Sequence, residues 1–425
     1  MSKRFHVVSR LAVRNLRRHV RRSVLTSLAM IVGGALLMMS FPLGDGTHEA
    51  WIESAVRMGG GHITIQNPDF RTSGKIDDRL PGDARAAAEE ALSQAGIAER
   101  VLIATPQLTL RGLASSAAGA RPAQIVGVSP ESEAEFTILD EKVAEGRYLE
   151  PGDRLAAYVG AGLVESLELR VGSRFVVTAQ DAEGEIAGQL LRVVGIFRSG
   201  VPEIDQALIH IPLTTAGEWL HSGNDITNIA VLVDESRQVE GLRRDLGRAL
   251  AGPIEVGALT VIGWREAMPT LDAAVRIDDF GNYLFQVILF TIIALGIVNT
   301  VLMSVLHRYR EFGVLQALGL TPRQTGSLVL IEGLILTALS GVIGIALGLF
   351  ITFYFWGEGL DISGMWNEEW SFSGVVMEPL IVPYFRVARV IQAFVFIVFI
   401  GALASVYPAY RAMRIDVAEA MKFER

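Results

Sequence analysis

Four long apolar windows dominate the pattern of hydrophobic and polar positions along this chain of 425 residues. A helix needs about 20 mainly apolar residues to cross a membrane, and no other stretch of the sequence approaches that length. The first window is longer than the apolar core of a cleavable signal peptide and ends in Phe41-Pro42-Leu43, so we expect an uncleaved anchor. The predicted transmembrane helices are 23–43, 280–306, 327–356 and 390–408.

Basic residues predict the orientation of these helices. They crowd into residues 1–22 and recur in the loop 307–326 and in the tail 409–425. The positive-inside rule places these three segments, and with them both termini, in the cytoplasm. Residues 44–279 and 357–389 then lie on the outer side, so more than half of the chain forms an extracytoplasmic domain and loop.

The segment before the first window has a helical pattern of its own. Val8, Leu11, Ala12 and Leu16 recur at helical spacing, while arginines occupy the other positions. We therefore expect residues 1–22 to form an amphipathic helix on the cytoplasmic leaflet. A merely basic flank is the alternative.

Short alternating runs in the extracytoplasmic domain predict β-strands at 62–66, 174–178, 190–196 and 207–211. Alanine-rich or amphipathic stretches between them predict helices at 81–95, 160–169 and 235–250. The expected fold class is an α+β membrane protein, with four transmembrane helices and a large mixed α+β domain between the first and the second. Strands near both ends of that domain favour two lobes.

Composition excludes several classes of function. The formal net charge of −8 argues against a basic nucleic-acid-binding face, and the absence of cysteine excludes disulfides and thiol nucleophiles. The histidines at 48, 62, 210 and 221 lack the spacing of metal ligands. Gly59-Gly60-Gly61 lacks the Lys-Ser/Thr of a phosphate loop, so we interpret it as a flexible connector. We predict no catalytic residue, no metal site and no cofactor on this chain.

The loop 307–326 is the most informative cytoplasmic segment. We expect the chain to turn at Gly313, to form a short amphipathic helix and to stop at Gly319, because glycine favours helix ends. A rigid helix with Phe312, Leu315 and Leu318 on one face could seat in a groove of a soluble partner. A plain turn between membrane helices is the alternative.

This loop and the helix before it resemble the signature of MacB/FtsX-type permeases of ABC transporters. The matching run begins Asn299-Thr300-Val301-Leu302-Met303-Ser304 and continues through Gly319. In that family it forms the coupling helix that docks on the ATPase. Further matches are Glu332-Gly333, the glycines at 341, 344 and 348, Tyr407-Pro408-Ala409, and, in the MacB-type periplasmic core domain, Glu145-Gly146-Arg147 and Val194-Gly195-Ile196-Phe197. Asp416 stands where the family often has proline.

The resemblance implies a permease subunit of the bacterial inner membrane with its large domain in the periplasm. It also implies no enzyme activity of the chain by itself: ATP and Mg would be bound by two separate cytoplasmic ATPase subunits, since the sequence has no Walker A motif. A second permease chain, identical or a close paralogue, and membrane lipids are further expected partners, as is a periplasmic carrier or adaptor. No nucleic-acid partner is expected.

The arrangement of the chain, with no ATPase domain fused to it, resembles that of the lipoprotein-releasing (LolC/LolE-like) permeases within this family. The segments 61–68 and 359–363 are similar to theirs, which implies extraction of lipoproteins or other lipidated cargo from the outer leaflet. The alternatives are tripartite efflux of a drug, toxin or peptide through a periplasmic adaptor, and an FtsX-like scaffold that activates a cell-wall hydrolase.

Two glutamates in and after the loop have expected partners. Glu332, near the start of the third helix, is expected to contact the coupling region, or else to snorkel to the interface. Glu311 would pair with the ATPase or with a neighbouring arginine.

Two groups of site residues follow from these expectations. The predicted ATPase-coupling residues are Arg308, Arg310, Glu311, Phe312, Gly313, Val314, Leu315, Ala317, Leu318 and Gly319. The predicted cargo cavity is lined by Met30, Met38, Phe41, Phe280, Tyr283 and Leu284, for each of which lipid-facing packing is the alternative.

Overall fold

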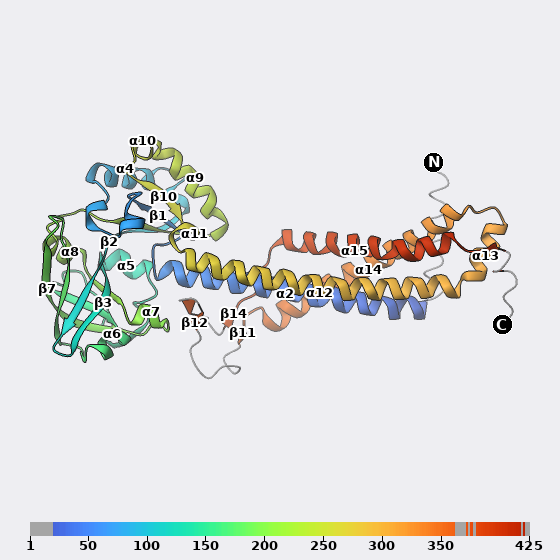
Figure 1. Cartoon of the computed structure of the whole chain (residues 1–425), viewed down its shortest axis with the longest axis horizontal. Helices are drawn as coiled ribbons and strands as arrows, with labels where there is room; N and C mark the ends of the chain where they lie inside the picture. The colour runs from blue at the N-terminus through green and yellow to red at the C-terminus, as the bar shows by residue number, and fades with distance from the viewer. Residues whose placement is uncertain (1–19, 362–370, 373–374, 377–379, 418–419, 421–425) are drawn as a thin grey trace. The chain divides into compact units, whose positions relative to one another are not determined.

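In the computed structural model the chain forms two compact units (Figure 1). The helical unit comprises Met1–His48, Ile277–Ile362 and Pro379–Arg425, and the sheet unit comprises Glu49–Arg276 and Ser363–Glu378. The structure describes all residues except 1–19, 362–370, 373–374, 377–379, 418–419 and 421–425. The predicted amphipathic helix at 1–22 lies almost entirely outside the described residues.

Four helices are long and apolar enough to cross a membrane, which confirms this part of the predicted fold class. They are α2 (Val20–Arg57), α12 (Pro269–His307), α14 (Pro322–Trp356) and α15 (Val387–Met413). Each helix is longer than its apolar window, because polar residues that favour helix continue it at one or both ends. The short helix α13 (Tyr309–Ala317) connects α12 to α14, and the two-residue strands β11 (Leu360–Asp361) and β14 (Leu380–Ile381) pair between α14 and α15.

Glycines let α14 approach its neighbours closely. A Cβ atom at Gly344 would lie 2.7 Å from the carbonyl oxygen of Ile31, and one at Gly348 would lie 2.6 Å from that of Ala35. Both contacts are with α2, whereas Gly341 faces Ile397 of α15. This small-xxx-small geometry confirms the interpretation of these glycines as packing positions within the bundle.

The sheet unit is built on one ten-stranded mixed sheet (Figure 1). Its order is β10-β1-β9-β2-β3-β8-β5-β7-β4, and β6 pairs with β2 and β7. The pairs β3–β8 and β5–β7 are parallel, and the other pairs are antiparallel. The strands are β1 (Ile63–Gln66), β2 (Val101–Ser116), β3 (Gly119–Val128), β4 (Val143–Gly146), β5 (Ala156–Gly160), β6 (Arg174–Gln180), β7 (Ile186–Phe197), β8 (Leu208–Pro212), β9 (Asn228–Val233) and β10 (Thr260–Gly263). The four strands predicted from alternation are confirmed.

Short helices cover the sheet. They are α3 (Phe70–Ser73), α4 (Gly82–Ser93), α5 (Pro130–Phe136), α6 (Ala161–Ser166), α7 (Pro202–Asp205), α8 (Leu213–Trp219), α9 (Val239–Ala249), α10 (Ala251–Glu255) and α11 (Trp264–Ala267). Separate hydrophobic cores form at the β10-β1-β9 end, where α4 and α9 pack, and around β5 to β8, where α6 and α8 pack. The expected two lobes therefore share one continuous sheet.

The glycine run after α2 forms the connection into β1, and its last residue is required by the backbone conformation there; its flexibility stays a prediction. Gly61 has φ +78°, a conformation that side chains with a Cβ rarely adopt. A Cβ atom there would also lie 2.6 Å from the carbonyl oxygen of Val231 on β9. The glycine is required because the turn passes directly against the neighbouring backbone.

Candidate functional site

The helix α12 ends at a sharp break at Arg308, which has φ −101° and ψ 18°. Helix α13 starts at the next residue and runs through Gly313, so the predicted turn at Gly313 is wrong. The glycine serves a packing purpose instead: a Cβ atom at this position would lie 2.6 Å from the Cβ atom of Ala420. Sequence alone cannot distinguish these two uses of a glycine, because the contact that requires it comes from more than 100 residues away.

Arg308 is the buried centre of the cytoplasmic loop. Its Nη1 donates to Glu332 Oε2 at 2.8 Å, and its Nε donates to Glu311 Oε2 at 3.0 Å. The guanidinium carbon also lies 4.7 Å from the ring centre of Phe312. Only 8% of the arginine side chain and 13% of the Glu332 side chain are exposed. The expected contact between Glu332 and the coupling region is confirmed, and Glu311 has the local arginine as a partner.

One face of α13 packs against its own chain, and the opposite face is exposed. Phe312 is fully buried in a core with residues of α12, α14 and α15, whereas Leu318 is 79% exposed. The expectation that Phe312, Leu315 and Leu318 share one docking face is therefore wrong for Phe312. The residues left open to a partner are Arg310, Glu311, Val314 and Ala317 on the helix, with Leu318 and Gly319 directly after it, and we call these six the outer face of α13.

Local signals fix both ends of the loop. Gly319 has φ +103°, so the helix stops where glycine predicts it. Thr321 then caps α14: its side chain accepts from the backbone N–H of Gln324, whose side chain accepts from the backbone N–H of Thr321. The outer face of α13 is thus held between a buried ion pair and a capping box.

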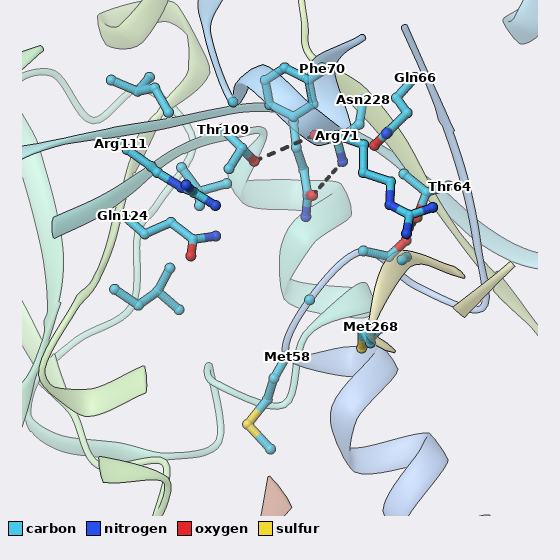
Figure 2. Close-up of a pocket in the computed structure, with 18 of the residues that line it drawn as sticks. Met58, Thr64, Gln66, Phe70, Arg71, Thr109, Arg111, Gln124, Asn228 and Met268 are labelled. Atoms are coloured by element: carbon cyan, nitrogen blue, oxygen red, sulfur yellow. Dashed lines mark hydrogen bonds between the residues drawn. The ribbon is translucent and has the colours of Figure 1, made fainter. Parts of the chain in front are cut away.

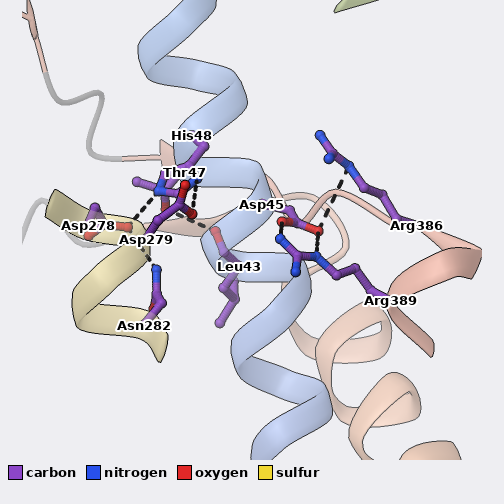
Figure 3. A network of polar contacts seen from close by, with 9 residues as sticks. All are labelled: Leu43, Asp45, Thr47, His48, Asp278, Asp279, Asn282, Arg386 and Arg389. Carbon is purple, nitrogen blue, oxygen red and sulfur yellow. Dashed lines mark hydrogen bonds and ion pairs between the residues drawn. The ribbon is translucent and has the colours of Figure 1, made fainter. Parts of the chain in front are cut away.

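A second polar network lies where the described parts of α2, α12 and α15 carry charged residues beside their apolar windows (Figure 3). Asp45 of α2 accepts from Arg389 of α15 at 3.0 and 3.2 Å. His48 of α2 contacts Asp278 of α12 at 2.6 Å. Asn282 donates to the same aspartate at 2.8 Å. Sequence reasoning missed this network, although a charged residue directly beside an apolar window was an available signal.

The six residues predicted to line a cargo cavity fall into two groups. Met30, Met38 and Phe41 of α2 are buried against other helices of the same chain. The side chains of the α12 group, Phe280, Tyr283 and Leu284, are more than half exposed. A cavity beside Phe41 has only about 20 Å³, which is too small for an acyl chain. The cargo cavity stays a prediction that concerns the exposed group on α12.

The chain matches two protein-family models. Residues 23–249, more than half of the chain, match the MacB-like periplasmic core domain. Residues 283–417 match the FtsX-like permease C-terminal domain. The first match takes in the first apolar window and most of the domain after it, and the second takes in the other three apolar helices.

Individual relatives agree with these models. LolC, a lipoprotein-releasing system transmembrane protein of Neisseria meningitidis, is 24% identical over 265 residues, which are 59% of this chain and 60% of that protein. MacB, a macrolide export ATP-binding/permease protein of Wolinella succinogenes, is 21% identical over 98% of this chain and 60% of that protein. The chain thus spans about three fifths of these relatives' length.

Among solved structures, the periplasmic region of MacB from Actinobacillus actinomycetemcomitans is similar over 52% of this chain and 97% of that one. The identity is 15% and the TM-score is 0.35. From the two family models, the chain belongs to the MacB/FtsX-type family of ABC transporter permeases.

Proposed function

We propose that this chain is the permease subunit that transmits the motion of cytoplasmic ATPase subunits across the inner membrane to its MacB-like domain. The main support for this proposal is the two-sided packing of α13. Its inner face is fixed to its own chain by Arg308 and Phe312, and its outer face remains open. A short rigid helix with one free, partly apolar face suits docking into a groove of a soluble partner.

In this proposal, two ATPase subunits bind ATP and Mg in the cytoplasm, and a second permease chain completes the complex. Both termini of this chain are cytoplasmic, and the sheet unit lies in the periplasm. Helices α2 and α12 supply residues to both units: Trp51 and Leu271 belong to a core of the sheet unit, and Met30 and Ile297 belong to a core of the helical unit. Displacing these helices therefore perturbs both cores.

The docking step is tested by replacing Leu318 with serine. Burying a leucine side chain at an interface contributes about 1.5–3 kcal/mol, so Leu318→Ser should reduce ATPase affinity by about tenfold or more. The measurement is the amount of ATPase subunit that co-purifies with the permease. The matched control is Leu102→Ser, which changes a 55% exposed leucine on β2. Equal ATPase recovery with both variants would refute docking on α13.

For the cargo, we propose lipoproteins or other acylated molecules held in the outer leaflet. The relative named as a lipoprotein-releasing protein supports this choice, and the exposed aromatic side chains of Phe280 and Tyr283 on α12 suit an apolar guest. A photo-reactive residue at position 280 should capture acylated protein. Phe399 of α15 is the matched control, because it is also a largely exposed phenylalanine in an apolar helix.

Tripartite efflux of a drug, toxin or peptide is the second candidate, because other relatives are named macrolide exporters. It predicts that the same experiment captures no acylated protein and that a periplasmic adaptor co-purifies with the chain. The FtsX-like scaffold ranks third, and it predicts capture of a cell-wall hydrolase and no cargo at either position.

A further inference from the structure

A polar cavity of about 280 Å³ lies on one face of the ten-stranded sheet (Figure 2). Thr64 and Gln66 line it from β1, and Gln107, Thr109 and Arg111 line it from β2. These positions are two residues apart along each strand, so they point to the same face. A buried sheet face is ordinarily apolar, because polar groups without partners cost free energy there. This face is polar across three neighbouring strands, since Asn228 of β9, between β1 and β2, also lines the cavity.

The floor of the cavity is a closed hydrogen-bond network. The buried carboxylate of Glu133 accepts from Gln107 at 3.0 Å and from Thr105 at 3.0 Å. Asn228 donates to Gln107 Oε1 at 2.9 Å. Burial raises the pKa of Glu133 to about 7 and lowers the pKa of His210, another lining residue, to about 4. Burial thus disfavours the charged form of both groups.

The rim carries two arginines without a counter-ion. Arg71 and Arg111 are exposed residues on opposite sides of the cavity (Figure 2), and neither has a carboxylate partner within the part of the chain that the structure describes. Two other arginines of the sheet unit do have carboxylate partners: Arg79 pairs with Asp225 at 2.6 Å and Arg100 with Asp245 at 2.8 Å. Two guanidinium groups that line one cavity and have no carboxylate partner there favour an anion.

An unused amide points to the same conclusion. Gln66 is only 7% exposed, yet its side chain makes no hydrogen bond with any of the residues that the structure describes. Its amide atoms are not enclosed by protein, so they face the open space of the cavity. In this cavity the free volume beside Gln66 leaves room for a partner, and a ligand with hydrogen-bonding groups would supply it.

We propose that this cavity binds a small solute that carries an oxyanion, a carboxylate or a phosphate, together with further hydrogen-bonding groups. Arg71 and Arg111 would hold the oxyanion, and Gln66 would bind the polar remainder. The volume is close to the lower end of small-molecule sites, which begin at about 300 Å³. This ligand is distinct from a lipidated cargo and from the ATPase, so the inference goes beyond the proposed function.

Calorimetric titration of the full chain in lipid nanodiscs tests the proposal. The probes are inorganic phosphate, acetyl-alanyl-alanine with a free carboxylate, and the amide of that dipeptide. At least one oxyanion should bind in the millimolar range or tighter, and the amide should bind at least about tenfold more weakly than the acid if the carboxylate is the preferred group. Tighter binding of phosphate would identify a phosphate compound as the natural class.

Variants connect the binding to the cavity. Arg71→Gln/Arg111→Gln and, separately, Gln66→Met should each weaken binding, the first by at least about tenfold. Arg121→Gln, which changes an exposed arginine on β3 outside the cavity, should bind as the wild type does. Thermal unfolding checks that each variant folds, and Gln66→Met tests the cavity without altering charge. No millimolar binding of either oxyanion, or equal loss with Arg121→Gln, would overturn the proposal.

Discussion

Arg308 joins the cytoplasmic loop to the third membrane helix through a buried ion pair. Removing one partner of a buried pair leaves the other charge uncompensated, which typically costs about 3–5 kcal/mol. We expect Glu332→Ala to lower the thermal unfolding midpoint of the purified chain clearly. The double variant Arg308→Met/Glu332→Leu should recover most of that loss, because apolar residues of similar volume often replace a buried pair at little cost. Additive losses in the double variant would contradict this account.

Glu133 makes the sheet unit less stable as the pH rises. Its folded-state pKa of about 7 lies above the ordinary value of 4.5, so the folded state retains the proton that the unfolded state has released. Stability from this group is full below pH 4.5 and is lost as the pH rises to about 7, by an amount on the order of 3 kcal/mol. Glu133→Gln should remove that dependence. Glu131→Gln, on the exposed side of the same helix, should leave it unchanged.

At single positions, the sequence predicted a contact correctly where an ionisable residue lies in an apolar window. The prediction failed where the packing of an apolar residue depends on which segment covers it. An ionisable residue inside an apolar window needs a partner, so the contact of Glu332 was predictable. Phe312 looked equally suited to a partner protein or to its own core, because periodicity marks an apolar side chain without saying what covers it.

The close helix packing of α14 and α2 gives a prediction for whole elements. A methyl group at Gly348 would meet both Ala35 and Met38, so Gly348→Ala should push the two helices apart and lower the unfolding midpoint. Gly281→Ala is the control, because a Cβ atom there has open space and alanine favours helix. It should be neutral or slightly stabilising. Equal destabilisation by both variants would show that helix packing is not the cause.

Elements were predicted well where their signal is local. Apolar length gave the four helices, and alternation gave four of the strands, because both are properties of a short window of sequence. The network of Asp45 and Arg389 could not be found in this way, since its partners are 344 residues apart. The order of the sheet strands, including the parallel pair of β3 and β8, likewise depends on long-range contacts that no window contains.

For the whole molecule, the fold class and the permease family were accessible from sequence because they rest on helix number and on one contiguous motif. Cargo class was not, because relatives with different named cargoes match the chain at similar identity. The proposed transmission of ATPase motion through this chain depends chiefly on what binds the outer face of α13.

The chain contains no cysteine, so a single introduced thiol can be labelled without background. The decisive measurement is photo-crosslinking from Leu318→Cys, labelled with a benzophenone maleimide, in membranes that contain the candidate ATPase. We predict a covalent adduct between this position and the ATPase subunit, and none from Leu102→Cys on β2. Absence of the ATPase adduct at position 318, in membranes where the intact complex is recovered, would contradict the account.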